Sequence, residues 1–349
     1  MIHYEKWEGK AELLNPFKDF ERETQVLEFR RDPLTGFISI ISKGRSQYVM
    51  KYFQCDEVLL KELIEESKKN CPFCPESVES KTPKFPPEVL PEGRLRIGDC
   101  WAVPALYAHA DFNAIIILGE KHFRRLNEFD SKLLRDGLLV AREILHSACK
   151  AYSDLKYATV IMGYLPTAGS SLLHPHMQVL AMKAPPNYVR ELFVKSLDYY
   201  LLNSRNYWQE IIKHESEEKS RLIGRIGRIW WLAPFAPLKR YEVLGVSEDK
   251  ASILELSNSD ITDIANGISR ILRFYDDMNI LAFNMAIISA PLGGELKKCF
   301  RLQTRICARF GFKKPFLSDF WALPTILNTD EIFEEPEEYA SKLRKYFSC

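Results

Sequence analysis

The sequence predicts an α+β fold in which one arrangement of strands around a helix occurs twice. Three observations support this prediction: an apolar content that can fill a large core, apolar runs typical of strands beside a helical pattern, and a second run of the same elements later in the chain. The 349 residues are 46% hydrophobic and 12% aromatic, which is typical of a globular chain and excludes a disordered or collagen-like one.

The first unit is expected between residues 101 and 181. Apolar or alternating runs predict strands at 101–103, 113–118, 158–162 and 174–181. After the second strand, Asp130 is a residue type that begins helices, and the apolar residues behind it share one helical face: Leu134, Leu138, Ala141 and Leu145. The expected order is strand, strand, helix, strand, strand.

The second unit repeats this order between residues 231 and 308. Strands are expected at 231–234, 242–246, 282–288 and 300–308, and Asp260 is expected to begin a helix whose apolar face carries Ile264, Ile268, Ile271 and Tyr275. An internal duplication explains the repeat, and a coincidence between two ordinary α+β units is the alternative. The charged segment 204–225 between the units is expected to be a solvated helix face or a connecting arm.

The register of the repeat makes the two units chemically unequal. Trp101 and Asp130 precede Trp231 and Asp260 by 130 positions. The same offset carries His174 and His176 onto Thr304 and Ile306, which cannot act as imidazoles do. We therefore expect the first unit to be active and the second to have lost that capacity.

Charge and hydropathy exclude two classes of partner. The chain has 48 Lys and Arg against 47 Asp and Glu, so no global field favours nucleic acid or an anionic membrane surface. The longest strictly apolar runs are the five residues 114–118 and 229–233, whereas a membrane-spanning helix needs about 20. Residues 1–10 lack the apolar core of a secretory signal. We expect a cytoplasmic protein with no nucleic-acid or membrane partner.

Cys71 and Cys74 form a C-x2-C pair, whose spacing lets two thiolates bind one tetrahedral metal ion. Eight Cys in this length are too few for a disulfide framework. No second C-x2-C pair exists, so histidines would complete the site, and the candidates are His109, His122, His174 and His176. A redox pair and two unreactive buried thiols are the alternatives.

The segment His174-Pro175-His176 places two imidazoles two residues apart, on one face of a strand. Such a pair suits two metal ligands, or one ligand and one nucleophile, and simple packing is the alternative. The preceding residues 163–171 are rich in small and hydroxyl side chains, which let backbone N–H groups approach an anionic oxygen. Neutral imidazole can attack phosphorus near pH 7, so phosphate chemistry fits this segment.

Several segments together resemble the galactose-1-phosphate uridylyltransferase family of the histidine-triad superfamily, over nearly the whole chain. The matching segments are Arg-Arg-Asp-Pro-Leu-Thr-Gly at 30–36, Ser-Lys-Gly-Arg at 42–45, Cys-Pro-Phe-Cys at 71–74, Gly-Glu-Lys-His at 119–122, Ala-Gly-Ser-Ser at 168–171 and His-Pro-His-Met-Gln at 174–178. The last resembles the family signature His-Pro-His-Gly-Gln. The resemblance implies two tandem histidine-triad-like domains, each an antiparallel sheet with packed helices, at 1–195 and 196–349.

The resemblance also implies the roles of site residues. It assigns a structural zinc ion to Cys71, Cys74, His122 and His174. His176 would be the nucleophile, and Gln178 would hydrogen-bond the phosphoryl oxygens. The implied substrate-binding residues are Arg45, Gly169, Ser170 and Ser171.

The activity implied is nucleotidyl transfer in two steps, as in a UDP-glucose:hexose-1-phosphate uridylyltransferase. A nucleoside monophosphate would pass from a nucleotide sugar to His176 and then to a sugar phosphate or phosphate. The alternatives are a phosphorylase that acts on a nucleotide sugar or a dinucleoside polyphosphate, and a nucleotide-binding protein without turnover. The family also implies a homodimer.

Several positions depart from the family pattern. Met177 replaces the signature glycine, and its side chain is expected on the opposite face of the strand from His176. Gly163 corresponds to a family asparagine. Thr304 and Ile306 stand where some relatives carry iron-binding histidines, so no iron site is expected. Residues 319–325 correspond to the hexose-recognition segment of the family, and only Phe320 of that segment is retained.

Overall fold

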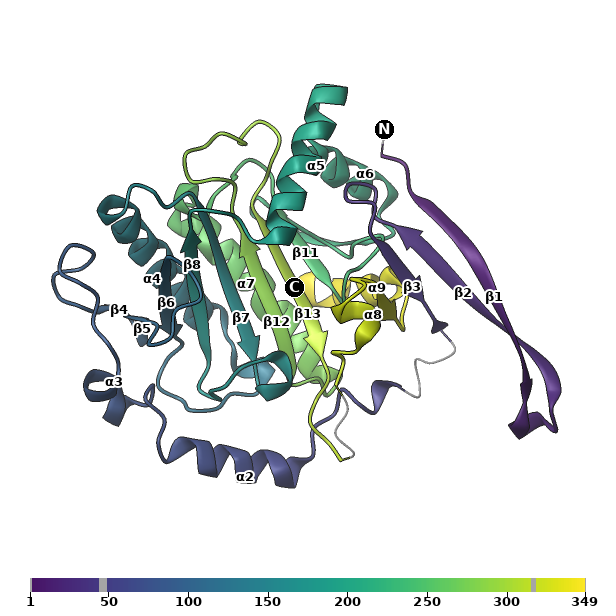
Figure 1. Cartoon of the computed structure of the whole chain (residues 1–349), viewed down its shortest axis with the longest axis horizontal. Coiled ribbons are helices and arrows are strands. Elements are labelled where there is room, and N and C mark those ends of the chain that lie inside the picture. The colour runs from purple at the N-terminus through teal and green to yellow at the C-terminus, as the bar shows by residue number, and fades with distance from the viewer. Residues whose placement is uncertain (1, 44–48, 315–317, 349) are drawn as a thin grey trace.

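A ten-stranded antiparallel sheet forms the centre of the molecule (Figure 1). The computed structural model describes residues 2–43, 49–314 and 318–348. The strands follow the order β4-β5-β6-β8-β7-β12-β13-β11-β10-β9. Their bounds are β4 (Leu95–Ile97), β5 (Cys100–Pro104), β6 (Phe112–Ile117), β7 (Tyr157–Tyr164), β8 (His176–Met182), β9 (Leu222–Ile226), β10 (Ile229–Leu232), β11 (Val243–Ser247), β12 (Ala282–Ile288) and β13 (Gln303–Arg309).

The order of the strands repeats within this sheet. The first five run β4-β5-β6-β8-β7, and the last five, read from the other edge, run β9-β10-β11-β13-β12. The two halves meet where β7 pairs with β12, from Tyr164 opposite Phe283 to Thr159 opposite Ile288. The α+β class is confirmed, and the predicted repeat of elements is visible as two halves of one continuous sheet.

The offset of 130 expected from the sequence is wrong for the strand that carries the histidines. The Leu118 N–H donates to the Pro175 carbonyl (2.9 Å), and the Ser247 N–H donates to the Leu302 carbonyl (3.0 Å) in the same position of the second half. These bonds make Gln303 the counterpart of His176. Ile306 instead lies in the main hydrophobic core.

The start of the second helix also differs from the position expected from the sequence by three residues. Ser257, not Asp260, is the N-cap residue, and its hydroxyl accepts from the Asp260 N–H while the Asp260 carboxylate accepts from the Ser257 N–H. Asp260 therefore completes a capping box from inside the helix. Asp130 is a true N-cap, since its carboxylate accepts from the Leu133 N–H.

Two long helices cover one face of the sheet (Figure 1). They are α4 (Ser131–Ala151) and α7 (Asn258–Asp277). All eight residues predicted to form their apolar faces are at most 1% exposed, because a period of 3.6 residues places them on one side of each helix. These helices and the sheet form the main hydrophobic core.

The opposite face of the sheet is covered only in part. Over the second half, a second core contains side chains of α5 (Asn187–Asn203) and α6 (Tyr207–Glu218). Over the first half, a small apolar cluster joins Cys71, Phe73 and Cys74 to Val103 and Ile117. The predicted catalytic side chains belong to this face, between the two covers.

The segment expected to be a solvated arm, 204–225, contributes to the second core. Tyr207 and Trp208 of α6 are 2% exposed. Glu215 is 1% exposed and accepts from the Arg221 guanidinium at 2.6 Å. The prediction of a solvated arm relied on the many charged residues of this segment. It overlooked the apolar side chains of α6, which lie on one face of the helix.

A smaller four-stranded sheet extends from the body, and its first two strands form the long arm seen in Figure 1. Its order is β1-β2-β3-β14, with bounds β1 (Glu5–Asn15), β2 (Glu21–Arg31), β3 (Ile38–Ile41) and β14 (Asp330–Ile332). The remaining helices are α2 (Glu57–Lys68), α3 (Pro75–Lys81), α8 (Ala322–Thr325) and α9 (Pro336–Phe347). In the described ranges, no helix has both the length and the apolarity to cross a membrane.

Candidate functional site

Four side chains from distant segments form a buried cluster suited to a metal ion. Cys71, Cys74, His122 and His174 each offer one donor atom, and these atoms all lie within 4.8 Å of one another. Cys74 is followed at once by α3, which begins at Pro75. All four residues are buried, and both cysteines are free thiols. Of the histidines considered from the sequence, His109 lies outside this cluster.

The separations within the cluster fit tetrahedral coordination. The Cys74 Sγ atom lies 3.4 Å from His122 Nδ1 and 3.7 Å from His174 Nδ1. Zinc–sulfur and zinc–nitrogen bonds of ordinary length place two tetrahedral ligands about 3.5 Å apart. The residues present therefore fit a Cys2His2 metal site, which disfavours the redox interpretation of the C-x2-C pair.

Hydrogen bonds outside the cluster orient both imidazoles. His174 Nε2 lies 2.9 Å from the Gly119 carbonyl, so Nε2 carries the proton and Nδ1 keeps its lone pair. His122 Nε2 lies 2.9 Å from the Ser67 hydroxyl at the end of α2. Burial lowers the pKa of His174 to about 4 and also lowers the pKa of His122. Both rings are thus neutral near pH 7 and direct Nδ1 towards Cys74, as metal ligands require.

His176 is the first residue of β8 and lies outside the metal cluster. Its Nδ1 lies 2.9 Å from the His174 carbonyl. Since a carbonyl only accepts, Nδ1 carries the proton and the Nε2 lone pair is available. Burial lowers the pKa of His176, and its half-buried ring lies 5.3 Å from the Phe73 ring. The neutral tautomer with a free Nε2 is the form that can act as a nucleophile.

Strand alternation places Gln178 beside His176 and turns Met177 away. Met177 is fully buried in the main core, whereas His176 and Gln178 are half-buried on the other face. The expectation for Met177 is confirmed. The Gln178 Oε1 atom accepts from Asn113 Nδ2 at 3.3 Å, which leaves the Gln178 NH2 group to donate to a ligand.

The residues expected to bind phosphate lie in the loop between β7 and β8. The short helix η4 (Pro166–Ala168) opens this loop, and Gly169 follows with φ +86°. No atom lies within 4 Å of the position that a Gly169 Cβ would take, so space is open there. The Ser170 hydroxyl donates to the Leu172 carbonyl at 2.6 Å, whereas Ser171 is exposed.

One expected substrate contact, Arg45, lies outside the described residues. Sequence reasoning missed Ser67, Gly119 and Asn113, which orient the site side chains. Gly119 begins the segment that contains His122, but the role of its carbonyl does not depend on residue type, and the other two are ordinary polar residues without a sequence signal. Their roles follow only from the pairing of segments that are far apart in the chain.

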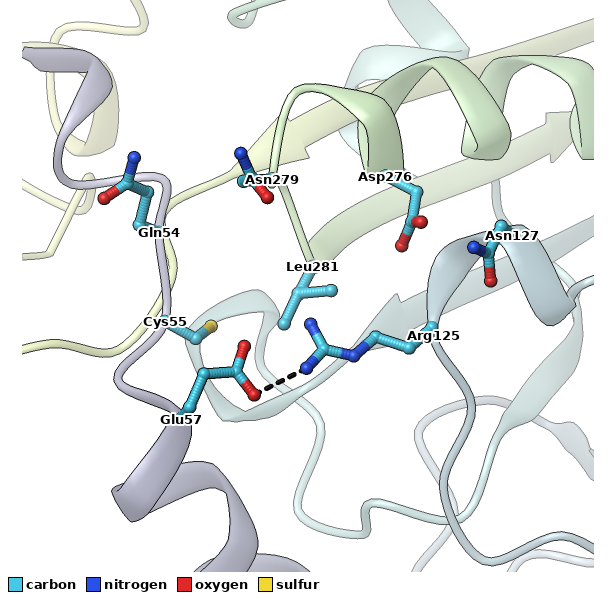
Figure 2. A pocket seen from close by; sticks show the side chains of 8 residues that line it. All are labelled: Gln54, Cys55, Glu57, Arg125, Asn127, Asp276, Asn279 and Leu281. Carbon is cyan, nitrogen blue, oxygen red and sulfur yellow. Dashed lines mark hydrogen bonds and ion pairs between the residues drawn. The ribbon is translucent and has the colours of Figure 1, made fainter.

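Several cavities lie outside this cluster. One, of about 240 Å³, borders β12 and β13 and is lined by Asn284, Arg305 and Cys307 among others. Another, of about 550 Å³, lies at the end of α7, where Glu57 and Arg125 form an ion pair of 2.5 Å (Figure 2). Its lining is polar and contains none of the expected site residues. The chemistry expected from the sequence therefore does not belong to the cavity of Figure 2.

The segment expected to recognise a hexose is engaged with the second half of the sheet. The Asp319 carboxylate pairs with the Arg309 guanidinium, and Arg309 also lies 4.3 Å from the centre of the Phe320 ring. Asp319 is buried and Phe320 is 62% exposed. This segment thus contributes a buried ion pair and an exposed aromatic ring.

Comparisons with known proteins give relatives over most of the chain. No family model matches the sequence. An uncharacterised protein of Archaeoglobus fulgidus is 30% identical over 327 residues, or 93% of this chain and 94% of that protein. The galactose-1-phosphate uridylyltransferase of Saccharomyces cerevisiae is 27% identical over 154 residues, or 43% and 42%. The ADP-glucose phosphorylase of Arabidopsis thaliana is 21% identical over 295 residues, or 77% and 80%.

Two solved structures share the fold over nearly their whole length. A GalT-like protein from Arabidopsis thaliana has a TM-score of 0.70 at 18% identity and covers 91% of this chain and 98% of that one. The Arabidopsis thaliana ADP-glucose phosphorylase with bound ADP-glucose has a TM-score of 0.71 at 17% identity and covers 91% and 99%. At these identities the likeness concerns the fold.

Proposed function

The chain belongs to the galactose-1-phosphate uridylyltransferase-like family of the histidine-triad superfamily, as a distant homologue of that enzyme and of ADP-glucose phosphorylase, and from this premise we propose that it transfers a nucleoside monophosphate through a nucleotidyl-His176 intermediate. The donor is a nucleotide sugar, and the acceptor is a sugar phosphate or phosphate. One observation carries the proposal: the His174 carbonyl holds the proton of His176 on Nδ1 and leaves Nε2 with its lone pair, which a nucleophile requires.

The reaction in this proposal has two steps that use the same atoms in opposite directions. His176 Nε2 forms a bond to the α-phosphorus of the donor, and the bond from that phosphorus to the bridging oxygen breaks, which releases a sugar 1-phosphate. A phosphate oxygen of the acceptor then attacks the same phosphorus, and the bond to Nε2 breaks. The Gln178 NH2 group and Ser171 donate hydrogen bonds to the phosphoryl oxygens, and Arg45 neutralises the diphosphate.

The metal in this proposal is zinc, held by Cys71, Cys74, His122 and His174. Zinc supplies closed structural coordination there, without an open position for substrate. Its ligands fix the segment that leads into β8, because His174 lies two residues before His176. The orientation of the nucleophile thus depends on the cluster through the His174 backbone carbonyl.

A phosphorylase is the second candidate, and a specific observation favours it. The similarity to ADP-glucose phosphorylase extends over 77% of this chain, against 43% for the uridylyltransferase. The segment expected to recognise a hexose also departs from the family pattern, and its Asp319 forms an ion pair with Arg309. In this candidate inorganic phosphate accepts the nucleotidyl group, while the step at His176 is the same. A nucleotide-binding protein without turnover is the remaining alternative.

The organisation of the chain completes the proposal. We place the catalytic domain with its zinc site at 1–195 and the domain without catalytic histidines at 196–349. The protein works as a homodimer on small phosphorylated substrates, in carbohydrate metabolism of the cytoplasm. Sedimentation of the purified protein measures the oligomeric state, and a monomer at micromolar concentration contradicts this part of the proposal.

Covalent labelling tests the central step. The protein is incubated separately with α-³²P-labelled UDP-glucose, ADP-glucose and diadenosine tetraphosphate, and the chain is then examined for acid-labile, base-stable radioactivity. We expect label from at least one donor in the wild type and none in His176→Ala. His146→Ala, on helix α4, is the matched control and should keep the label. Tight nucleotide binding without label from any donor would favour the binding-protein alternative.

A further inference from the structure

The loop expected to grip phosphate has a backbone that the surrounding structure must hold in place. Leu165 is fully buried and has φ +71° with ψ 161°, a positive-φ conformation that is rare for a leucine. The Leu165 carbonyl accepts from the Ala168 N–H (3.0 Å) and the Ser170 N–H (3.2 Å). Such a conformation persists only where other contacts determine it, so the contacts on this loop decide where Gly169 and Ser171 lie.

Asn284 makes a contact that reaches this loop from the second half of the chain. Its Nδ2 donates to the Ala168 carbonyl at 2.8 Å. Asn284 lies on β12 opposite Gly163 of β7, at the junction of the two halves. A Cβ atom on Gly163 would come within 2.5 Å of the Ala168 oxygen and 3.1 Å of Asn284 Nδ2. The absence of a side chain at Gly163 therefore makes room for this bond.

The amide of Asn284 is itself oriented by a buried ion pair. Its Oδ1 accepts from Arg309 Nη1 on the neighbouring strand β13. Arg309 in turn donates from Nε to Asp319 Oδ2 at 2.6 Å and forms a second bond from Nη2 to Oδ1. The Arg309 and Asp319 side chains are 8% and 5% exposed. Because a guanidinium only donates, the amide oxygen must face Arg309 and the NH2 group must face the loop.

We propose that Asn284 is a positioning residue for the loop at 165–171, and that Arg309 and Asp319 hold Asn284 in its working orientation. The loop follows β7 in the first half, whereas Asn284, Arg309 and Asp319, which we call the relay, all belong to the second half. The kinetic part of this inference rests on the proposed function, because it needs a phosphoryl group to be bound and transferred. The ordering of the loop does not.

The relay assigns the second half a task in the reaction although it lacks the histidines. Asn284 touches no reacting atom, so its loss displaces the loop without removing the nucleophile. Displacements of about 1 Å in groups that position a substrate lower rates by up to about a hundred-fold. The expected signature is a slower chemical step with nearly unchanged nucleotide affinity.

Asn284→Asp is the most informative variant. The carboxylate has the shape of the amide and still accepts from Arg309, but it cannot donate to the Ala168 carbonyl. Asn206→Asp is the matched control: Asn206 Nδ2 donates to the Lys298 carbonyl at 2.9 Å, and its Oδ1 caps α6. The two substitutions make the same chemical change in similar bonds, and only one of these bonds reaches the loop.

Two measurements on the full chain separate the relay from the proposed function. Hydrogen exchange of peptides that cover residues 165–172 should become at least about ten-fold faster in Asn284→Asp and unchanged in Asn206→Asp. In single-turnover labelling, Asn284→Asp should form nucleotidyl-His176 about ten- to a hundred-fold more slowly, with the dissociation constant of the labelled donor within two-fold of wild type. Arg309→Gln should shift both readouts in the same direction.

The outcomes distinguish the two ideas. Unchanged exchange of the loop in Asn284→Asp overturns the relay, whatever the wild type does with a donor. If exchange is faster only in the loop of Asn284→Asp, and the wild type takes no label, the result supports the ordering role and counts against the proposed function. Equal losses of the transfer rate in both Asp variants, with equal falls in melting temperature, indicate a general loss of stability and overturn the positioning role.

Discussion

The two halves of the large sheet share a strand order but carry different chemistry at equivalent points. His176 opens β8 and is half-buried, with Nε2 free. Its counterpart Gln303 opens β13 and is fully buried, with no hydrogen-bond partner for Nε2. The backbone architecture alone therefore does not make a site. Access and the partners of each side chain decide which half can act on a ligand.

The next residue on the same face of each strand, Gln178 in β8 and Arg305 in β13, extends this contrast. Gln178 pairs across the sheet with Ile161, Ile161 with Ala286, and Ala286 with Arg305. The Gln178 NH2 group takes no part in the bond to Asn113, whereas Arg305 donates to Glu242 Oε1 at 2.6 Å. Along this row of paired residues, the first half thus carries an available side-chain donor, whereas the second half carries an ion pair.

Removal of the nucleophile should give the largest effect. His176→Ala should lower nucleotidyl transfer by several orders of magnitude, because no other group supplies the covalent intermediate. The measurement is the rate of transfer from whichever labelled donor the wild type accepts. Gln303→His sharpens the comparison, since it places an imidazole at the equivalent but buried point. Label on residue 303 in a His176→Ala background would contradict the distinction between the halves.

Loss of the metal cluster should come next in size. Cys74→Ser should abolish metal binding in the first half and lower the melting temperature, because closed coordination stabilises the folded state. Elemental analysis and calorimetry of the same samples measure both effects. Cys299→Ser, which changes a buried cysteine of the second half, should leave the metal content at the wild-type value. A metal-free Cys74→Ser protein that melts with wild type would show that the cluster does not stabilise the fold.

The ion pair between Arg305 and Glu242 in the second half should affect stability rather than chemistry. Glu242→Gln leaves the Arg305 guanidinium, whose side chain is 14% exposed, without its counter-charge. Breaking a buried ion pair on one side costs about 3 kcal/mol or more, which urea unfolding can measure. Glu12→Gln breaks the exposed pair with Arg22 and should cost under about 1 kcal/mol. Equal effects of the two substitutions would show that burial of the first pair has no energetic weight.

The smallest effect should come from a residue that only orients a metal ligand. Ser67→Ala removes the hydroxyl beside His122 Nε2. Such contacts usually contribute about ten- to a hundred-fold to metal affinity, so a competition assay with a chelator should detect the change. Ser216→Ala is the control, because Ser216 is half-buried and its hydroxyl bonds within its own helix, far from the cluster in the chain. A metal affinity that stays at the wild-type value would remove Ser67 from the orientation of His122.

The parts of the fold with strong local patterns were predictable from the sequence. The apolar faces of α4 and α7 follow from helical periodicity, and β12 has the predicted bounds, residues 282–288. The register of the repeat was not predictable, because Ser257 and Asp260 both favour a helix start and only the structure shows which one is the cap. An error of three residues then moved the counterpart of His176 to the wrong face.

The candidate site also has one part that was predictable from the sequence and one part that was not. The cysteine pair and the two histidines of the signature stand out in the sequence, and resemblance to a family selected His122 from the remaining histidines. The relay through Asn284 could not be predicted, because it depends on which residues of β7 and β12 lie opposite each other. Pairing between segments more than a hundred residues apart is set by the whole sheet, and ordinary Asn and Arg residues carry no local signal of it.

The junction of β7 and β12 also bears on how such a chain could arise. Either half alone would expose the bare edge of a central strand, and such an edge invites pairing with another molecule. Two identical single-unit ancestors that joined by this edge would make the same ten-stranded sheet as a symmetric dimer. Fusion of their genes would then keep the edge covered throughout, and it would free one copy to carry Gln303 and Arg305 where the other carries His176 and Gln178.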